Sequence, residues 1–155
     1  MTTRRLLALN VGSSTLKGAS YLFNTEGHGA QSRLLERSRA EIPVGVDAQE
    51  RLATLLEALS EPWPSPDVVV HRIVHGGDLH DARELDETVL VKLDALVPFA
   101  PLHQPVALAF ARAARMRWPH ARQGVAFDTD FHASLAPWRR PKRLTTWTGR
   151  RCPAH

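Results

Sequence analysis

The sequence contains a single cysteine, Cys152, and no apolar run that approaches the length of a membrane span. One cysteine excludes an intrachain disulfide framework, so a reducing cytoplasm is the expected compartment. Crossing a bilayer takes about 20 consecutive apolar residues, which excludes an integral membrane protein. Arg4 and Arg5 precede a short apolar run, as in a signal peptide, but that run stops at Asn10 and is too short for a secretory apolar region. We therefore expect a cytoplasmic protein without a membrane partner.

No acidic residue follows Asp130, so the net charge of +4 arises from the C-terminal end of the sequence. Six of the 20 Lys and Arg residues lie in the segment 139–151, which leaves 14 basic against 16 acidic side chains in residues 1–138. The body of the chain is therefore mildly acidic, and the basicity belongs to its tail. We do not expect nucleic acid as a partner of the folded body.

The hydrophobic pattern that is present changes period along the chain. It predicts strands at 5–11, 16–23, 33–42, 67–74 and 123–128, and helices at 47–59, 87–97 and 103–118. The third of these strands carries interspersed charges and is expected near an edge. The strand 67–74 is nearly all apolar, as is typical of a central strand covered on both faces, so Val70 and Val74 should be buried. Strands first, then strand–helix alternation, indicate an α/β domain with a mixed sheet.

Residues 139–155 lack this pattern, because Pro and Arg dominate and apolar residues are isolated. We therefore divide the chain into a folded domain at 1–138 and a basic tail at 139–155. Such a composition is typical of a disordered segment. It also fits an out-of-frame product, since shifted GC-rich codons often encode Arg, Pro and Ala. A selected tail that binds a polyanion is the alternative.

The first segment whose residue types suggest ligand binding is residues 10–17. A glycine followed by Ser13, Ser14 and Thr15 in a predicted hairpin turn would present backbone and hydroxyl donors to an anion. Lys17 on the next strand would add a compact positive charge for phosphate. The segment is not a P-loop, which needs Gly-Lys-Ser/Thr at the start of a helix. On this segment alone, an ordinary serine-rich hairpin is the simpler interpretation.

Three further polar positions interrupt apolar segments. Arg72 lies in an apolar strand, where an unpaired guanidinium would be costly, so it must meet a carboxylate, a phosphate or the open end of the sheet. A structural ion pair and a ligand site both satisfy that need. His103 stands between prolines at a helix start, where a histidine commonly caps or packs. Asp128 follows a buried strand, where ligand sites of open α/β sheets gather, although a loop-bracing role is the alternative.

Taken together, these segments resemble the signatures of the acetate kinase family and its propionate and butyrate kinase relatives. The matching segments are 10–17, 71–77, 98–105 and 125–132, in the family's order and spacing. The resemblance covers residues 5 to about 138. It implies a ribonuclease H-like mixed sheet with flanking helices, as in the superfamily of actin, Hsp70 and the acetate and sugar kinases. The family's second domain has no counterpart in this sequence.

The resemblance implies ATP and Mg²⁺ as cofactors. Asn10 matches the family's magnesium-site residue, and Lys17 matches its ATP-site lysine. We assign Ser13, Ser14 and Thr15 to the same nucleotide site.

The resemblance also implies acetate or another short carboxylate as substrate, phosphorylated by ATP to an acyl phosphate and ADP. Arg72 matches the arginine that binds the carboxylate or phosphoryl group, and Asp128 the residue usually called the proton donor/acceptor. His103 matches a histidine near the active site, and Val74 with Leu102 part of the apolar pocket for the acyl methyl group. A carboxylate is already ionised near neutral pH and needs no general base, so we expect Asp128 to orient magnesium through water or to position the nucleophile.

The resemblance also implies that family members are typically homodimers and supply the adenosine pocket from their second domain, so this chain is expected to be incomplete alone.

Two alternatives belong to other functional classes. A non-catalytic remnant or interaction module of the same fold is the first alternative. A ribonuclease H-like nuclease that uses the basic tail ranks last, because two-metal nucleases need several carboxylates and Asn10 stands where the first would be expected.

Overall fold

The computed structural model describes residues 3–12, 15–24, 31–41, 47–57 and 65–129. Ser13, Ser14 and Asp130 lie outside the described residues, as does the tail predicted at 139–155.

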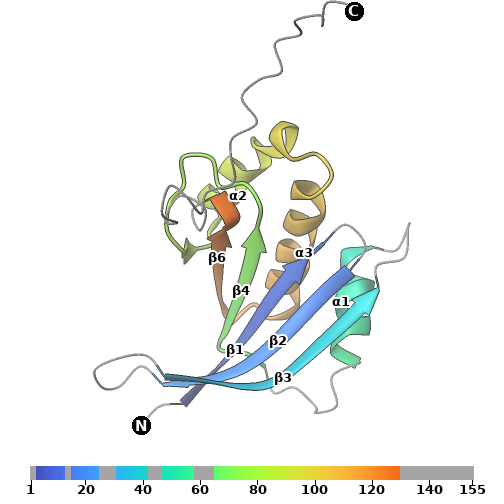
Figure 1. The fold of residues 1–155 in the computed structure, drawn as a ribbon, viewed down its shortest axis with the longest axis vertical. Helices are drawn as coiled ribbons and strands as arrows, with labels where there is room; N and C mark the ends of the chain where they lie inside the picture. The colour runs from blue at the N-terminus through green and yellow to red at the C-terminus, as the bar shows by residue number, and fades with distance from the viewer. Residues whose placement is uncertain (1–2, 13–14, 25–30, 42–46, 58–64, 130–155) are drawn as a thin grey trace, which may run out of the picture.

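A six-stranded mixed sheet forms the centre of the molecule, in the order β3-β2-β1-β4-β6-β5 (Figure 1). Its strands are β1 Thr3–Val11, β2 Thr15–Asn24, β3 Gln31–Glu41, β4 Val68–Ile73, β5 Arg83–Glu84 and β6 Arg122–Phe127. The first three form an antiparallel meander, whereas β4 and β6 run parallel to β1. This ribonuclease H-like arrangement confirms the predicted fold class and the edge position of β3. The two-residue β5 was not predicted, because so short a strand has no hydrophobic period.

Helices follow the predicted positions with shorter bounds. They are α1 Ala48–Glu57, α2 Glu87–Asp94, α3 Gln104–Arg117 and the short 3₁₀ helix η1 Val97–Phe99. The Asp47 carboxylate caps α1 by accepting hydrogen bonds from the backbone N–H groups of Gln49 and Glu50, at 2.7 and 3.1 Å. The helix predicted at 87–97 ends early, and η1 follows with a proline in its first turn. None of the described helices is long and apolar enough to cross a membrane.

The core lies between one face of the sheet and the helices. Leu7, Leu9 and Leu16 project from β1 and β2 against Leu52 of α1 and Phe110 of α3, and all five are buried. A second cluster joins strands β4 and β6 to α2 and α3; it includes Ile73, Phe127, Leu90 and Leu108. In the described part of the chain the helices lie behind the sheet in the view of Figure 1, so the near face of the sheet is open.

The prediction that β4 is covered on both faces is therefore wrong for the described residues. Val69, His71 and Ile73 point to the core and are buried, while Val70 is only half-buried and Arg72 is exposed on the opposite face. Val74, also expected to be buried, is half-buried as well. A continuous apolar run predicts a strand that is buried on both faces. In the described part of the chain, however, the helices cover only one face of the sheet.

Candidate functional site at the carboxyl ends of the parallel strands

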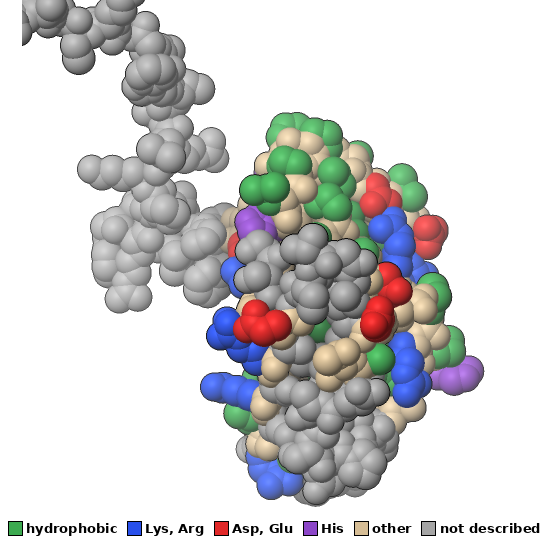
Figure 2. Space-filling model, turned by 90° about the vertical axis from the view of Figure 1, so that its right-hand side faces the viewer, with side chains coloured by type: hydrophobic (Ala, Val, Ile, Leu, Met, Phe, Trp, Pro, Cys, Tyr) green, Lys and Arg blue, Asp and Glu red, His purple; other side chains and the backbone are tan. Residues whose placement is uncertain are grey.

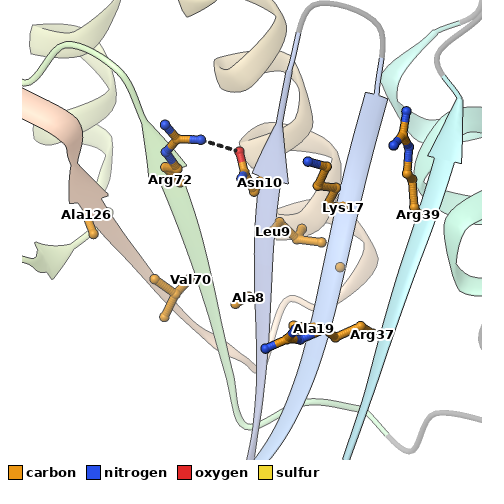
Figure 3. Close-up of a pocket in the computed structure, with 11 residues that line it drawn as sticks. Ala8, Leu9, Asn10, Lys17, Ala19, Arg37, Arg39, Val70, Arg72 and Ala126 are labelled. Carbon is orange, nitrogen blue, oxygen red and sulfur yellow. Dashed lines mark hydrogen bonds between the residues drawn. The ribbon is translucent and has the colours of Figure 1, made fainter. Parts of the chain in front are cut away.

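Asn10, Arg72 and Asp128 meet at one edge of the sheet. Asn10 and Arg72 are register partners on the parallel strands β1 and β4, and Asp128 directly follows β6. Arg72 Nη1 donates to Asn10 Oδ1 at 3.0 Å (Figure 3), while its Nε and Nη2 donate to the two carboxylate oxygens of Asp128 at 2.7 and 2.6 Å. The carboxyl ends of parallel strands gather at the same edge, so residues 62 and 56 positions apart come into contact. The predicted convergence of these three residues is confirmed.

The guanidinium of Arg72 is the centre of this contact network. Its side chain is 53% exposed and that of Asp128 is 24% exposed, so the pair faces solvent rather than the core. The hydrogen bond to the Asp128 carboxylate raises the pKa of Arg72, which keeps the guanidinium charged. A guanidinium carries five N–H groups, and three of them serve Asn10 and Asp128. Within the described part of the chain, one N–H on each terminal nitrogen therefore remains for an oxyanion.

Lys17 and Thr15 flank this edge from β2. Lys17 is exposed, is the register partner of Asn10, and points toward it (Figure 3). Thr15 is half-buried, and its carbonyl oxygen accepts a hydrogen bond of 2.7 Å from the N–H of Gly12. A Cβ at Gly12 would lie 3.3 Å from Thr15 Oγ1, so this hairpin turn has little room for a larger residue. The roles of Lys17 and Thr15 in nucleotide binding stay predictions.

A cavity of about 540 Å³ opens on the uncovered face beside these residues. Asn10, Lys17 and Arg72 line its upper margin, Arg39 of β3 lies on its far side, and the side chain of Arg37 extends from β3 across β2 (Figure 3). Sequence reasoning missed both arginines and treated them as charges of an edge strand. Their alternate spacing was a signal that they share a face, but only the pairing of β3 with β2 shows that this face is the one that carries Lys17.

The other three substrate-side residues predicted from the resemblance lie on two different segments: Leu102 and His103 directly precede α3, and Val74 directly follows β4. His103 occupies the position before α3, is exposed, and makes no side-chain cap bond. Leu102 is 77% exposed and Val74 is half-buried. In the described part of the chain no hydrogen bond or ion pair joins His103 to Arg72 or Asp128. The roles of Val74, Leu102 and His103 therefore stay predictions.

Gln104 is a positioning residue that sequence reasoning did not identify. Its buried side-chain nitrogen donates to the carbonyl oxygens of His75 and Leu93, at 3.0 and 3.3 Å. It therefore ties the loop after β4 to α2 and α3. The same loop packs tightly on β6, because a Cβ at Gly76 would lie 2.7 Å from the Phe127 ring. These contacts support the strand ends that hold Arg72 and Asp128.

The oxygens at the site allow a limited test for magnesium. Asn10 Oδ1 and both carboxylate oxygens of Asp128 accept hydrogen bonds from the Arg72 cation. The described residues contain no group of three or more His, Cys, Asp or Glu side chains that could hold a metal ion. Mg²⁺ often keeps several waters and binds through one or two carboxylates plus substrate phosphates. The roles of Asn10 and Asp128 toward Mg²⁺ therefore stay predictions.

Comparison with known proteins identifies what the chain is similar to. A family model described as the acetokinase family matches residues 5–140. The acetate kinase of Methylocella silvestris is 33% identical over 134 residues, which cover 84% of this chain and 33% of that protein. Acetate kinase 1 of Neisseria meningitidis serogroup A is 32% identical over 154 residues, covering 87% of this chain and 38% of that protein. The chain thus spans between 33% and 38% of the length of these relatives.

Solved structures agree with the sequence comparison. The acetate kinase of Entamoeba histolytica superposes with a TM-score of 0.59 at 28% identity, over 90% of this chain and 39% of that one. The acetate kinase of Porphyromonas gingivalis gives a TM-score of 0.59 at 26% identity, over 86% and 39% of the two chains. The similarity covers nearly all of the fold described above.

Proposed function

Because the chain belongs to the acetokinase, or acetate kinase, family, we propose that its domain forms the carboxylate- and phosphate-binding wall of a short-chain carboxylate kinase. The observation that carries the proposal is the contact of Arg72 with both Asn10 and Asp128 at the strand ends. Three separate sequence motifs thereby present a fixed cation with two unused N–H groups beside an open cavity.

The reaction is in-line transfer of the γ-phosphoryl group of ATP to acetate or propionate. A carboxylate oxygen attacks the γ-phosphorus, the bond to the β–γ bridging oxygen breaks, and the products are an acyl phosphate and ADP. Such transfer depends on positioning and charge neutralisation more than on covalent help from the protein. Bound Mg²⁺ would neutralise charge on the phosphates, with Asn10 and Asp128 as its supports on this chain.

Arg72 has the central role in this proposal. Its two remaining N–H groups hold the acceptor carboxylate end-on, while the side-on contact with Asp128 fixes the plane of the guanidinium. The positive charge reduces the repulsion between the carboxylate and the incoming phosphates. Asp128 acts as the positioning residue for Arg72 and for bound water, since an ionised substrate has no proton to remove. Lys17 adds a second cation on the phosphate side.

Because the site is exposed, we expect the 155-residue chain alone to have little activity. Arg72 is more than half exposed, and in the described part of the chain no helix covers the face of the sheet beside it (Figure 1). A single wall does not exclude water or enclose both substrates, which lowers the effective strength of every charge at the site. We therefore propose negligible turnover of acetate and ATP by this chain, with measurable ligand binding.

The test combines an assay with a binding measurement. Acyl-hydroxamate formation from acetate, propionate and butyrate should stay at background, while acetate with MgATP should shift the NMR signals of Asn10 and Arg72. Arg72→Ala should abolish the shift at Asn10. Arg112→Ala, which removes an exposed arginine paired with Asp94 on α2, is the matched control and should leave both shifts intact.

Two outcomes would change this conclusion. Saturable turnover that Arg72→Ala abolishes would show a working kinase, since a contaminating host enzyme would not respond to that substitution. A folded chain that binds neither acetate nor MgATP would favour the non-catalytic module of the same fold.

A further inference from the structure

We propose that Arg39 is a phosphate-binding residue, and that the row Arg39–Lys17–Asn10–Arg72 binds a linear polyphosphate such as the triphosphate of a nucleotide. The inference rests on the proposed function, in which ATP is the phosphate donor, and adds to it Arg39, a residue on β3. Neither the motifs nor the family comparison assigns Arg39 a role.

The row follows from the register of four neighbouring strands. Arg39 of β3 pairs with Lys17 of β2, Lys17 with Asn10 of β1, and Asn10 with Arg72 of β4. Register partners point to the same face of a sheet, and neighbouring strands lie about 4.8 Å apart, so the row extends roughly 14 Å across the sheet. Figure 3 shows the four side chains side by side along one margin of the cavity. A line of separated cations suits a chain of phosphate groups better than a single phosphate.

The cations of the row are available to a ligand. Among the described residues Lys17 has no acidic partner. Arg39 pairs with Glu41 of its own strand at 3.3 Å, and both side chains are well exposed, so this ion pair contributes little and can exchange for a phosphate. Arg72 ends the row with its two remaining N–H groups. The row therefore presents three positive charges, of which only the one on Arg72 is firmly paired.

Among the described residues that line the cavity, none is acidic, so no carboxylate repels an anion bound along the row. The next positions on the same face are Ala19, Ala8 and Val70, which are register partners of one another and line the floor of the cavity. Their small apolar side chains offer no hydrogen bonds to a phosphate. They do lower the local dielectric beside the row, which strengthens its attraction for an anion. Arg37 is the register partner of Ala19 at the end of this second row, and its side chain extends across β2 toward β1 (Figure 3), which adds positive charge over the floor of the cavity.

Charges on an edge strand also serve solubility, and the chain offers a control for that explanation. Edge strands commonly carry exposed cations that prevent edge-to-edge association, and Figure 2, which views the molecule from the side of β3, shows Lys and Arg side chains at the surface there. Arg33 lies on the same strand and is exposed, but it pairs with Leu22, whose alternation places it on the face opposite the cavity. Arg33→Gln therefore removes the same charge from the same strand without touching the row.

The experiment titrates inorganic triphosphate, MgATP and inorganic phosphate into the full chain and its variants by calorimetry at fixed ionic strength. Arg39→Gln should weaken triphosphate and MgATP binding about tenfold, as expected for one lost charge-assisted hydrogen bond. It should change inorganic phosphate binding less than twofold, and Arg33→Gln should leave all three within twofold. Thermal melting should be the same for both variants, because both side chains are exposed.

Two results would overturn the proposal. Unchanged triphosphate binding in Arg39→Gln excludes Arg39 from the site, and equal losses in Arg39→Gln and Arg33→Gln indicate non-specific attraction to the strand. The proposed kinase function fails separately, through acetate and MgATP binding that does not respond to Arg72→Ala.

Discussion

Asp128 holds Arg72 through two parallel hydrogen bonds, from Nε to Oδ1 at 2.7 Å and from Nη2 to Oδ2 at 2.6 Å. This side-on fork joins the end of β6 to the end of β4 and fixes the plane of the guanidinium. Both partners are accessible to solvent, so the contact orients a charge at the surface rather than holding the core together.

The first prediction follows from that exposure. Asp128→Asn should change the free energy of unfolding by less than about 1 kcal/mol, because exposed ion pairs contribute little. It should weaken binding of acetate with MgATP at least tenfold, because the guanidinium loses the carboxylate that orients it. Chemical denaturation and NMR titration of the same variant measure the two effects. A loss of about 3 kcal/mol or more would instead assign the pair a structural role.

The second prediction concerns pH and His71. Burial lowers the pKa of this histidine, while its hydrogen bond to Gln123 at 2.9 Å acts in the opposite direction with a smaller effect. The unfolded chain therefore binds the proton more readily, so stability is fully present above about pH 6.5 and falls as pH decreases through the folded-state pKa. Unfolding free energies measured from pH 7.5 to 5 should show this decline. In His71→Gln the decline should be smaller, and an equal decline in both proteins would contradict the assignment.

The third prediction compares two glycines that differ in the space available for an added Cβ atom. A Cβ at Gly76 would meet the Phe127 ring at 2.7 Å and the Leu79 carbonyl oxygen at 2.8 Å, whereas one at Gly124 would meet nothing closer than 3.6 Å. We expect Gly76→Ala to lower stability by about 1–3 kcal/mol, as for overpacking in a core. Gly124→Ala, in the middle of β6, should be neutral or slightly stabilising, because alanine orders a strand at less entropic cost. Denaturant midpoints of the two variants provide the comparison, and equal midpoints would count against it.

The fourth prediction compares two phenylalanines. Phe110 on α3 is fully buried between the sheet and α1, whereas Phe99 on η1 is 71% exposed and only stacks on His75 at a ring distance of 5.8 Å. Phe110→Ala should cost about 3–5 kcal/mol through the cavity it leaves. Phe99→Ala should stay within about 0.5 kcal/mol of the parent, as is usual at the surface. Thermal unfolding followed by circular dichroism tests both values, and a large loss in Phe99→Ala would reveal packing that its exposure does not show.

The last prediction concerns the tail expected from composition at 139–155. The family match ends at residue 140, close to the proposed boundary at 138. The segment holds too few apolar residues to offset the entropy of ordering it, so deleting it should leave the melting temperature within about 2 °C. Scanning calorimetry of the full and shortened chains measures this difference. A fall of more than about 8 °C would show that the tail contributes to the domain.

Local pattern in the sequence predicted much of the fold. The alternation of apolar residues identified the five longer strands and three helices, because side-chain period depends on secondary structure alone. The positions of Asn10, Arg72 and Asp128, each at or near the end of a predicted strand beside a glycine-containing or polar loop, also predicted that the three would converge. That inference succeeded because the ends of parallel strands must gather at one edge, whatever the details of packing.

Other features depend on which elements pack together. The sequence alone determined that β4 is apolar, but the placement of α1, α2 and α3 on one side of the sheet decided that Val70 and Arg72 face an open cavity. The sequence also shows the charged residues of β3, but it does not show which residues of β2 lie beside them. A register shift between Ser20 and Tyr21 lies within the pairing of β2 with β3, and a slip of one residue would turn every side chain of β3 to the other face. Only the tertiary structure therefore places Arg39 beside Lys17, because register is decided by contacts between strands and not by the residues of either strand alone.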